Sequence, residues 1–577
     1  MPGTLRNDTY NDPAAVELAQ VPSTTYDRSI SPVHASDTSV HAPGHENPED
    51  DTVPERHHRA SKFRLRSIIG SLLITTILSA LEGTIVSTAL PTVVSALGGG
   101  ELYFWAANGY FLASTAVQPL YAQLADVFGR RWPTIAAVSL FVFGSGISGG
   151  AISMHMLIGG RVIQGIGGGG ISVLVNLIVC DLVPLRQRGK YFALIYGATT
   201  ISSGLAPFLS GVIVTNASWR WIFYLNLPIG GLALLLLFTF LQVRAEKQGT
   251  MERLKRIDFL GHFVFVCSVT SILIALTYAG SVHPWSSWRT ILPLVLGFTG
   301  LGAYLVYEGL EIPVQPSMPL RIFANRTSGA VFGLGFLHSL LTIWTIYFLP
   351  VYFQSVKQST PQQAGIQFLP TSLVLMPFAA VSGKLLERFG FYRILHGIGL
   401  AGMTAGFGVF TLLTASSSTA QWALIQFLQA AGAGLLISTM LPAVQAPLPD
   451  EDTGVVTGAF TFCRSFGVAW AVTVPATLFN NRFGQLAYQI QDVSVRAQLS
   501  GGKAYEHATE AFVGSLQGQT QTEVVSVYTD SLKFVWQVAI GISAVAFLLV
   551  FFEKHYELRE SLNTKFGVDD KHKEEAP

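Results

Sequence analysis

Long apolar runs constrain this chain more than any other feature. A helix that crosses a lipid bilayer needs about 20 mostly apolar residues, and fourteen stretches of the 577-residue chain meet that length. No stretch alternates apolar and polar residues as a strand would, and helices satisfy their own backbone hydrogen bonds in lipid. We therefore predict an all-α membrane protein with fourteen spans. They lie near 67–90, 103–123, 133–153, 157–180, 190–214, 219–243, 258–278, 289–308, 328–354, 364–386, 392–414, 421–446, 455–480 and 533–552.

The composition excludes several other classes of protein. Only 12% of the residues are charged, against about 25% in an ordinary soluble domain, and a net charge of +1 gives no reason to expect nucleic-acid binding. The three cysteines lie in apolar runs without the spacing of a zinc site. No nucleophile–base pair or metal-binding cluster is visible, so we predict neither an enzyme nor a bound metal or cofactor.

The glycine run Gly165–Gly170 matches the spacing GxGxxG of a dinucleotide fold. That fold needs a preceding strand and a soluble βαβ unit, whereas this run lies inside a predicted span. Small residues let membrane helices approach closely, so close helix packing is the better interpretation.

Lysine and arginine fall on one side of the predicted membrane. The loops around Arg130, Arg186 and Arg253 are basic, whereas the alternate loops at 95–102 and 414–421 contain no lysine or arginine. Basic loops stay in the cytoplasm, so we predict that both termini are cytoplasmic. Asn216 matches a glycosylation acceptor but lies against the membrane, and we expect it to be unmodified.

A short charged turn occurs twice in the chain. The segment 121–131, YAQLADVFGRR, returns in degraded form at 381–393, VSGKLLERFGFYR. In both copies an acid, Asp126 or Glu387, stands three residues before a glycine. Each copy follows the second span of a six-span group, which indicates two related halves with an inserted pair of spans. Internal duplication of this kind is typical of secondary transporters.

This repeat divides the chain into five parts. They are a disordered cytoplasmic tail at 1–65, an N-terminal six-helix half at 66–243, a linker with spans 7 and 8 at 244–327, a C-terminal six-helix half at 328–555 with an outer loop at 481–532, and a cytoplasmic tail at 556–577.

Ionisable residues inside the membrane are costly and usually functional. Glu82 lies deep in the first span, and Arg161 lies at a similar depth in the fourth. If these spans face each other, the pair either exchanges protons or forms a static ion pair that fixes helix packing. Arg464 lies deep in the thirteenth span without an acid at similar depth; it either extends to the cytoplasm or takes part in transport.

Several segments resemble the major facilitator superfamily, and within it the fourteen-span drug:proton antiporters of fungal type. The likeness covers roughly 65–565 and is carried by 81–91, 122–131, 161–165, 219–230 and 349–354. It implies proton coupling by Glu82 and Arg161. It also implies a gating role for the charged turns, which hold Asp126, Gly129, Arg130, Arg131, Glu387 and Arg393. The antiporter motif of the fifth span is weaker, with Ala206, Pro207, Ser210 and Gly211 in place of its usual Gly-Pro and Gly-Gly pairs.

The expected cargo site is poor in charge and rich in aromatic and amide side chains. Its candidate residues are Asn108, Tyr110, Gln118, Gln164, Asn226, Trp344, Tyr347 and Gln354. Such a lining suits small apolar or amphipathic compounds: drugs, fungicides, toxins or secondary metabolites.

We therefore expect proton-driven export by alternating access, carried out by a monomer in the plasma membrane rather than the vacuolar membrane. Uptake of a siderophore or of vacuolar amino acids by the same fold is the first alternative. A membrane receptor that transports nothing is the second.

Overall fold

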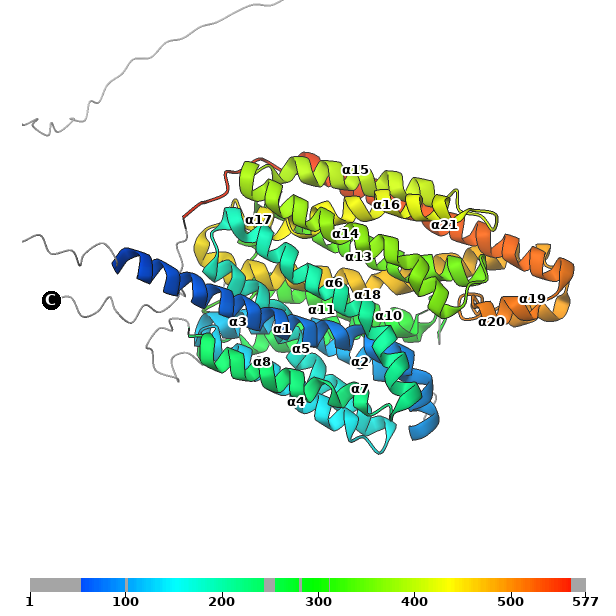
Figure 1. Cartoon of the computed structure of the whole chain (residues 1–577), viewed down its shortest axis with the longest axis horizontal. Helices are drawn as coiled ribbons and strands as arrows, with labels where there is room; N and C mark the ends of the chain where they lie inside the picture. The colour runs from blue at the N-terminus through cyan, green and yellow to red at the C-terminus, as the bar shows by residue number, and fades with distance from the viewer. Residues whose placement is uncertain (1–52, 99–101, 243–254, 280–282, 311, 562–577) are drawn as a thin grey trace, which may run out of the picture. The chain divides into compact units, whose positions relative to one another are not determined.

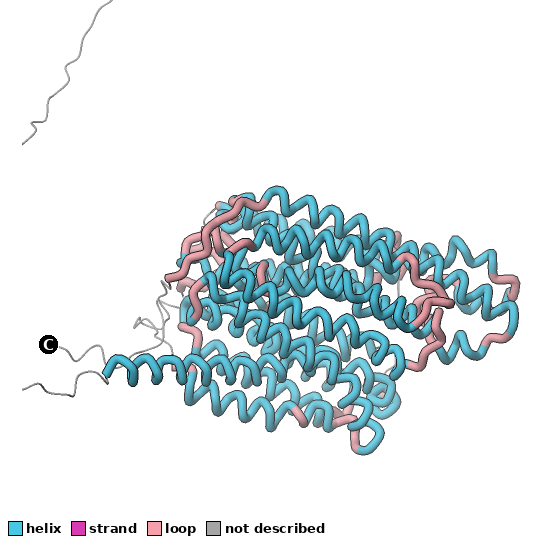
Figure 2. Tube along the Cα trace, turned by 45° about the horizontal axis from the view of Figure 1, so that its top comes forward, coloured by secondary structure: helices cyan, strands magenta, loops and turns pink. Residues whose placement is uncertain are grey.

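The computed structural model describes residues 53–98, 102–242, 255–279, 283–310 and 312–561. Within these ranges the regular elements are helices and no strand forms (Figures 1 and 2), as predicted. Twelve described helical segments are long and apolar enough to cross a bilayer. They coincide with twelve of the fourteen predicted spans.

The two remaining predicted spans correspond to helices that fall outside this group of twelve. The span at 103–123 is divided into α2 (Tyr103–Ala116) and α3 (Gln118–Phe128), which meet at Val117. The span at 392–414 corresponds to α15 (Tyr392–Phe410). The helical class is therefore confirmed, and the number fourteen remains a prediction.

In the helices α1 to α8, which we call the N-terminal half, α5 contacts α2, α3, α4 and α6. Their bounds are α1 Val53–Leu97, α2 and α3 as above, α4 Arg131–Gly149, α5 Met154–Leu182, α6 Arg188–Asn216, α7 Trp221–Tyr224 and α8 Asn226–Phe240. Helices α2 and α4 run along α5, and α8 packs on α4. The glycine run of α5 makes this close packing possible. An added Cβ at Gly167 would overlap the backbone of Ala137 and Phe141 in α4.

The segment between the two halves, predicted to be an inserted linker, forms the helices α10 (Phe259–Tyr278) and α11 (Trp288–Gly309), which pack against each other. Helix α10 also contacts α2 of the N-terminal half and α18 (Thr453–Leu486). Trp285 donates its indole N–H to the Thr477 hydroxyl of α18 at 2.7 Å. The pair of α10 and α11 therefore contacts both halves.

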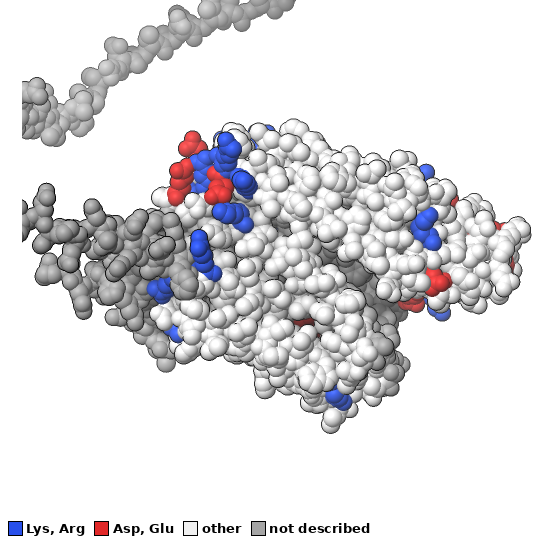
Figure 3. Space-filling model, in the orientation of Figure 1, with Lys and Arg blue, Asp and Glu red and all other residues white. Residues whose placement is uncertain are grey.

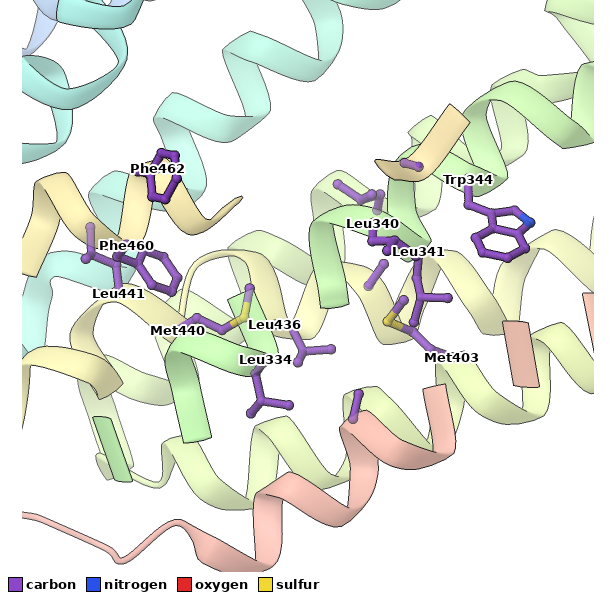
Figure 4. Close-up of a cluster of buried hydrophobic side chains, with 14 of the residues drawn as sticks. Leu334, Leu340, Leu341, Trp344, Met403, Leu436, Met440, Leu441, Phe460 and Phe462 are labelled. Atoms are coloured by element: carbon purple, nitrogen blue, oxygen red, sulfur yellow. The ribbon is translucent and has the colours of Figure 1, made fainter. Parts of the chain in front are cut away.

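The helices α12 to α21, which we call the C-terminal half, share an apolar core. Their bounds are α12 Arg321–Ala324, α13 Arg326–Ser355, α14 Pro361–Phe389, α15 Tyr392–Phe410, α16 Thr419–Ile437, α17 Met440–Gln445, α18 Thr453–Leu486, α19 Val493–Leu499, α20 Glu510–Ser515 and α21 Gly518–Leu549. Figure 4 shows side chains from five of these helices meeting in this core: Leu334, Leu340, Leu341, Trp344, Met403, Leu436, Met440, Leu441, Phe460 and Phe462.

The predicted tails and outer loop are partly helical or packed. Helix α1 begins at Val53, within the segment 1–65 that was expected to be disordered, and residues 1–52 lie outside the described part. The region 481–532 holds the end of α18, the short helices α19 and α20, and the start of α21. After α21 the chain stays on the protein, where the Tyr556 N–H donates to the Tyr392 hydroxyl at 2.9 Å.

Charged side chains avoid the flanks of the helices. Figure 3 shows a lateral face that is nearly free of charge along its middle, with charged side chains toward both ends of the helices and the largest group of lysine and arginine at the left end. Large apolar side chains on this protein are also exposed, such as Phe143, Phe208 and Phe263, each more than 60% accessible. A surface of this kind is suited to lipid.

We expect Gly167→Ala to destabilise the N-terminal half, because the new methyl group overlaps the α4 backbone. Overpacking of this kind typically costs about 1–3 kcal/mol. Gly159→Ala is the matched control, since nothing lies within 4 Å of an added Cβ there on the same helix. The thermal midpoint of the detergent-purified protein should fall for the first variant only. Equal midpoints for the two variants would contradict the packing argument.

Candidate functional site

Glu82 and Arg161 form an ion pair inside the N-terminal half. The Arg161 guanidinium of α5 donates to Oε1 of Glu82 in α1. Both side chains are at most 1% exposed, so this charge pair is enclosed by protein. The two residues that the sequence placed at similar depth do face each other, although this does not distinguish proton exchange from a static pair.

Amide and hydroxyl groups surround this pair. Asn226, the first residue of α8, donates to Oε2 of Glu82 at 2.6 Å. Gln164 lies one turn from Arg161 on α5, accepts from its Nη1 at 2.7 Å, and donates to the Ser145 hydroxyl of α4 at 2.7 Å. Four helices thus supply one buried polar network. Such networks are stable only when their members are satisfied.

Aromatic rings enclose the arginine. The guanidinium carbon lies 4.7 Å from the ring centre of Tyr110 and 5.9 Å from that of Phe223. Its Nε donates to the Ala106 carbonyl oxygen at 3.0 Å. The Tyr110 hydroxyl is within hydrogen-bond distance of Ser79, at 3.2 Å. A carboxyl group held in this way can change protonation only if the arginine, the amides or the surrounding helices rearrange with it.

The residues predicted to line one cargo pocket lie in different places. Tyr110, Gln164 and Asn226 belong to the Glu82 network. Gln118 donates to Ser465 of α18 at 2.9 Å, and Asn108 is partly exposed on α2.

The remaining three pocket candidates are on α13. Trp344 is fully buried, Tyr347 is 43% exposed, and Gln354 is partly exposed near the end of the helix. The structure therefore brings together the residues around Glu82 and does not gather all eight.

The four antiporter-motif positions lie in α6, and Ala206 is the one that packs in a cluster with residues of α1. Ala206 is fully buried in the same cluster as Leu81 and Ile85, which flank Glu82 in sequence. Ser210 is also fully buried, and its hydroxyl oxygen has no hydrogen-bond partner within the described part of the chain. An added Cβ at Gly211 meets nothing within 4 Å. Pro207 lies within α6, but its side chain is outside the described part.

The first charged turn is built around Arg130. Its guanidinium donates to Asp126 at 2.7 Å, to Asp181 at 2.6 Å and to the Ala125 carbonyl oxygen at 2.6 Å. Gly129 ends α3 with φ +80°, a backbone conformation that side chains rarely adopt. Arg131 caps α8 instead, donating to the Phe238 carbonyl oxygen at 2.9 Å.

The same turn reaches the C-terminal half. An added Cβ at Gly454 would collide with the Asp126 carboxylate, so this carboxylate lies against the first turn of α18. The backbone N–H groups there have no partner within the helix and favour a negative charge. One turn further along, an added Cβ at Gly458 would overlap Ala122 of α3. Helices α3 and α18 therefore meet closely at this end.

The second charged turn also ends its helix with a glycine of positive φ, but ψ is 3° at Gly390 and 173° at Gly129, and the ion pairs are not repeated. Gly390 ends α14 with φ +72°, as Gly129 ends α3. Glu387 lines a surface pocket with Arg186, Gln187 and Glu560, next to the start of α6. Arg393 is exposed on α15, and the described part of the chain shows no ion pair between it and Glu387. The two acids thus occupy similar places beside the opposite half, with different partners.

Sequence reasoning missed a polar contact between the halves. Arg188, at the start of α6, donates to the Gln445 side-chain oxygen of α17 at 2.6 Å. The Gln445 amide donates to Thr457 of α18 at 2.9 Å and to the Cys180 sulfur of α5 at 3.3 Å. Only the basic loop at 186–190 marked this place in the sequence, because the partners lie more than 250 positions away.

The chain is similar to known transporters in sequence and in fold. The family model described as Major Facilitator Superfamily matches residues 72–472. The MFS-type transporter gkaD of Penicillium citrinum is 48% identical over 545 residues, which are 94% of this chain and 93% of that protein. The efflux pump FUS6 of Gibberella moniliformis is 44% identical over 530 residues, 91% of this chain and 93% of that protein. The human organic anion transporter MFSD10 (TETRAN) shares the fold, with a TM-score of 0.55 at 15% identity over 84% of this chain and 99% of that one.

Proposed function

Because the chain belongs to the major facilitator superfamily, whose members move small molecules across membranes, we propose that it exports organic compounds in exchange for protons. The observation that carries this proposal is the buried pair of Glu82 and Arg161 with Asn226 on its second oxygen. The naming of one relative as an efflux pump supports export over uptake. The fourteen-span topology of the drug:proton antiporter group is part of the same proposal.

In this mechanism Glu82 carries the proton. A carboxyl group in a buried site is pulled in two directions: burial favours the neutral form and a neighbouring guanidinium favours the charged form. A movement that separates Arg161 from Glu82 would favour protonation, and their reunion would favour release. Helix α6 lies against α1 beside Glu82 and also packs against α14 of the C-terminal half, so it would couple this change to movement of the halves.

The arrangement is closed at the end that carries the charged turns. Helix α3 meets α18 at Ala122 and Gly458, and α6 meets α14 at Gly189 and Gly383. At the second contact an added Cβ on Gly189 would lie 3.2 Å from the Gly383 Cα. We assign this end to the cytoplasm from its basic loops, and the charged turns would then stabilise the cytoplasmic-closed state.

The proposed cargo is a small, largely apolar or amphipathic compound, such as a drug, fungicide, toxin or secondary metabolite. The proposed location is the plasma membrane, with a monomer as the working unit. Import by the same fold is the alternative, and the direction of cargo movement separates the two.

Topology has its own test. Epitope tags at the N-terminus and after Asp570 should be accessible only in permeabilised cells, because both ends are expected in the cytoplasm. A tag beside Gly501, between α19 and α20, should be labelled on intact cells. External labelling of either terminus would overturn the fourteen-span proposal.

Accumulation measurements test the proposed direction. Cells that lack the protein should retain more of a fluorescent amphipathic drug than cells that express it, and a susceptibility panel should show hypersensitivity to the natural cargo. Greater retention in the expressing cells would indicate uptake instead. Equal retention across the whole panel would favour a receptor.

A further inference from the structure

Arg464 is a second arginine deep within the helices. It lies about 17 Å along α18 from Thr453 at 1.5 Å per residue, in a hydrocarbon layer about 30 Å thick. Its guanidinium stacks over the ring of Tyr196 in α6, 4.8 Å from the ring centre. Its Nε donates to the Ser339 hydroxyl of α13 at 3.2 Å. Both halves therefore contribute to the place where Arg464 is held.

This arginine has no acidic partner in the part of the chain that the structure describes. Among the described residues its two terminal nitrogens have no hydrogen-bond partner, and the side chain is partly exposed. The carboxylate of Glu82, in the first span, is already bound by Arg161 and Asn226. An ionised group inside a membrane is costly without a counter-charge and commonly marks the path of a substrate.

Other polar groups lie at a similar depth. Ser465, the next residue of α18, accepts a hydrogen bond from Gln118 of α3 at 2.9 Å. That bond uses the Gln118 amide nitrogen; the side-chain oxygen of Gln118 is buried and has no hydrogen-bond partner among the described residues. Gln118 lies about 15 Å along α3 from Phe128, so α3, α6, α13 and α18 all place polar groups near mid-membrane. Secondary transporters bind their substrates at this depth, between their halves.

We propose that the terminal nitrogens of Arg464 bind an anionic group of the cargo, a carboxylate or an ionised acidic enol on an otherwise apolar molecule. A guanidinium has the planar donor pair that matches a carboxylate, and the Tyr196 ring and Ser339 fix its orientation. The inference rests on the proposed transport function and narrows its substrate to lipophilic acids.

Equilibrium binding to the purified protein tests this inference without any proton gradient. The probes are 11-(dansylamino)undecanoic acid and its methyl ester, which differ only in charge at one end, in a gluconate buffer free of chloride. The wild-type protein should bind the acid more tightly than the ester. Arg464→Gln should weaken acid binding by about 10- to 100-fold, as expected for losing hydrogen bonds to a charged group, and leave ester binding within about twofold. Arg464→Lys should keep part of the preference.

The control is Arg289→Gln, which removes an exposed arginine at the start of α11 and should bind both probes as the wild type does. Equal affinity of the wild type for the two probes, or no binding of the acid at all, overturns the inference. So does unchanged acid binding by folded Arg464→Gln. If Arg464→Gln does not fold, the wild-type preference and its reduction in Arg464→Lys decide the matter. Loss of proton coupling in a Glu82 variant leaves these binding results unaffected, so the two proposals fail separately.

Discussion

Glu82→Gln should still bind cargo but should not pump it uphill. Glutamine keeps the shape of the side chain and a hydrogen-bonding oxygen for Arg161 or Asn226, but it cannot take up or release a proton. Positioned proton transfer typically contributes about 10²–10⁴-fold to a rate, so gradient-driven accumulation in vesicles should fall by about 100-fold or more. Glu82→Asp should retain partial activity, because the drug:proton antiporters that this chain resembles usually have aspartate at this position.

The matched control is Glu308→Gln. Glu308 is a buried carboxyl on α11 that accepts from the Ser317 N–H and hydroxyl at 3.1 and 2.8 Å, far in sequence from the Glu82 network. The Glu308→Gln variant should pump at a near-normal rate once protein amounts are equalised. Removing the acid leaves Arg161 without its counter-charge, and breaking a buried pair can cost about 3–5 kcal/mol, so folded protein must be measured alongside. Uphill transport by Glu82→Gln at the wild-type rate would show that Glu82 does not carry the proton and serves only in helix packing.

Asp126→Asn should loosen the closed end of the protein and slow transport. The carboxylate lies against the first turn of α18 and pairs with Arg130. A negative charge at a helix N-terminus contributes about 0.3–2 kcal/mol, so its loss should lower the ratio of closed to open states by about 2- to 30-fold. Cys180 is 1% exposed at the contact between the halves and reports this change. With Cys267 and Cys463 replaced by serine, maleimide should label Cys180 faster in Asp126→Asn.

Asp530→Asn controls for the lost charge, since Asp530 is exposed on α21. It should leave both the labelling rate and transport unchanged. If Asp126→Asn matches the wild type in both measurements, the charged turn marks topology and has no part in the movement.

The sequence was most informative about charged residues inside the membrane, because such residues are rare there. Charged groups are scarce inside the apolar runs, so Glu82 and Arg161 stood out, and similar depths were enough to bring them together. The prediction that Asn226 contacts cargo stays a prediction, and the sequence did not reveal that Asn226 donates to Glu82. Nothing in its neighbourhood in sequence marked that partner, 144 positions away.

Contacts between distant helices could not be predicted in this way. The bond from Arg188 to Gln445 and the buried pair of His396 and Glu553, with nitrogen and oxygen 2.9 Å apart, join residues 257 and 157 positions apart. The repeat predicted equal roles for the two charged turns. Both glycines have a positive φ, but their ψ angles differ, and Arg393 is exposed where Arg130 is buried among acids. Side-chain partners are set by neighbours that the repeat does not preserve.

Proton movement in reconstituted vesicles tests the central proposal most directly. The purified protein would be placed in liposomes that contain a pH-sensitive dye, with an outward gradient of the compound to which cells lacking the protein are most hypersensitive. The proposal predicts that protons enter as the compound leaves, and that Glu82→Gln abolishes this proton flux. Movement of the compound without protons, or of both in the same direction, would contradict it.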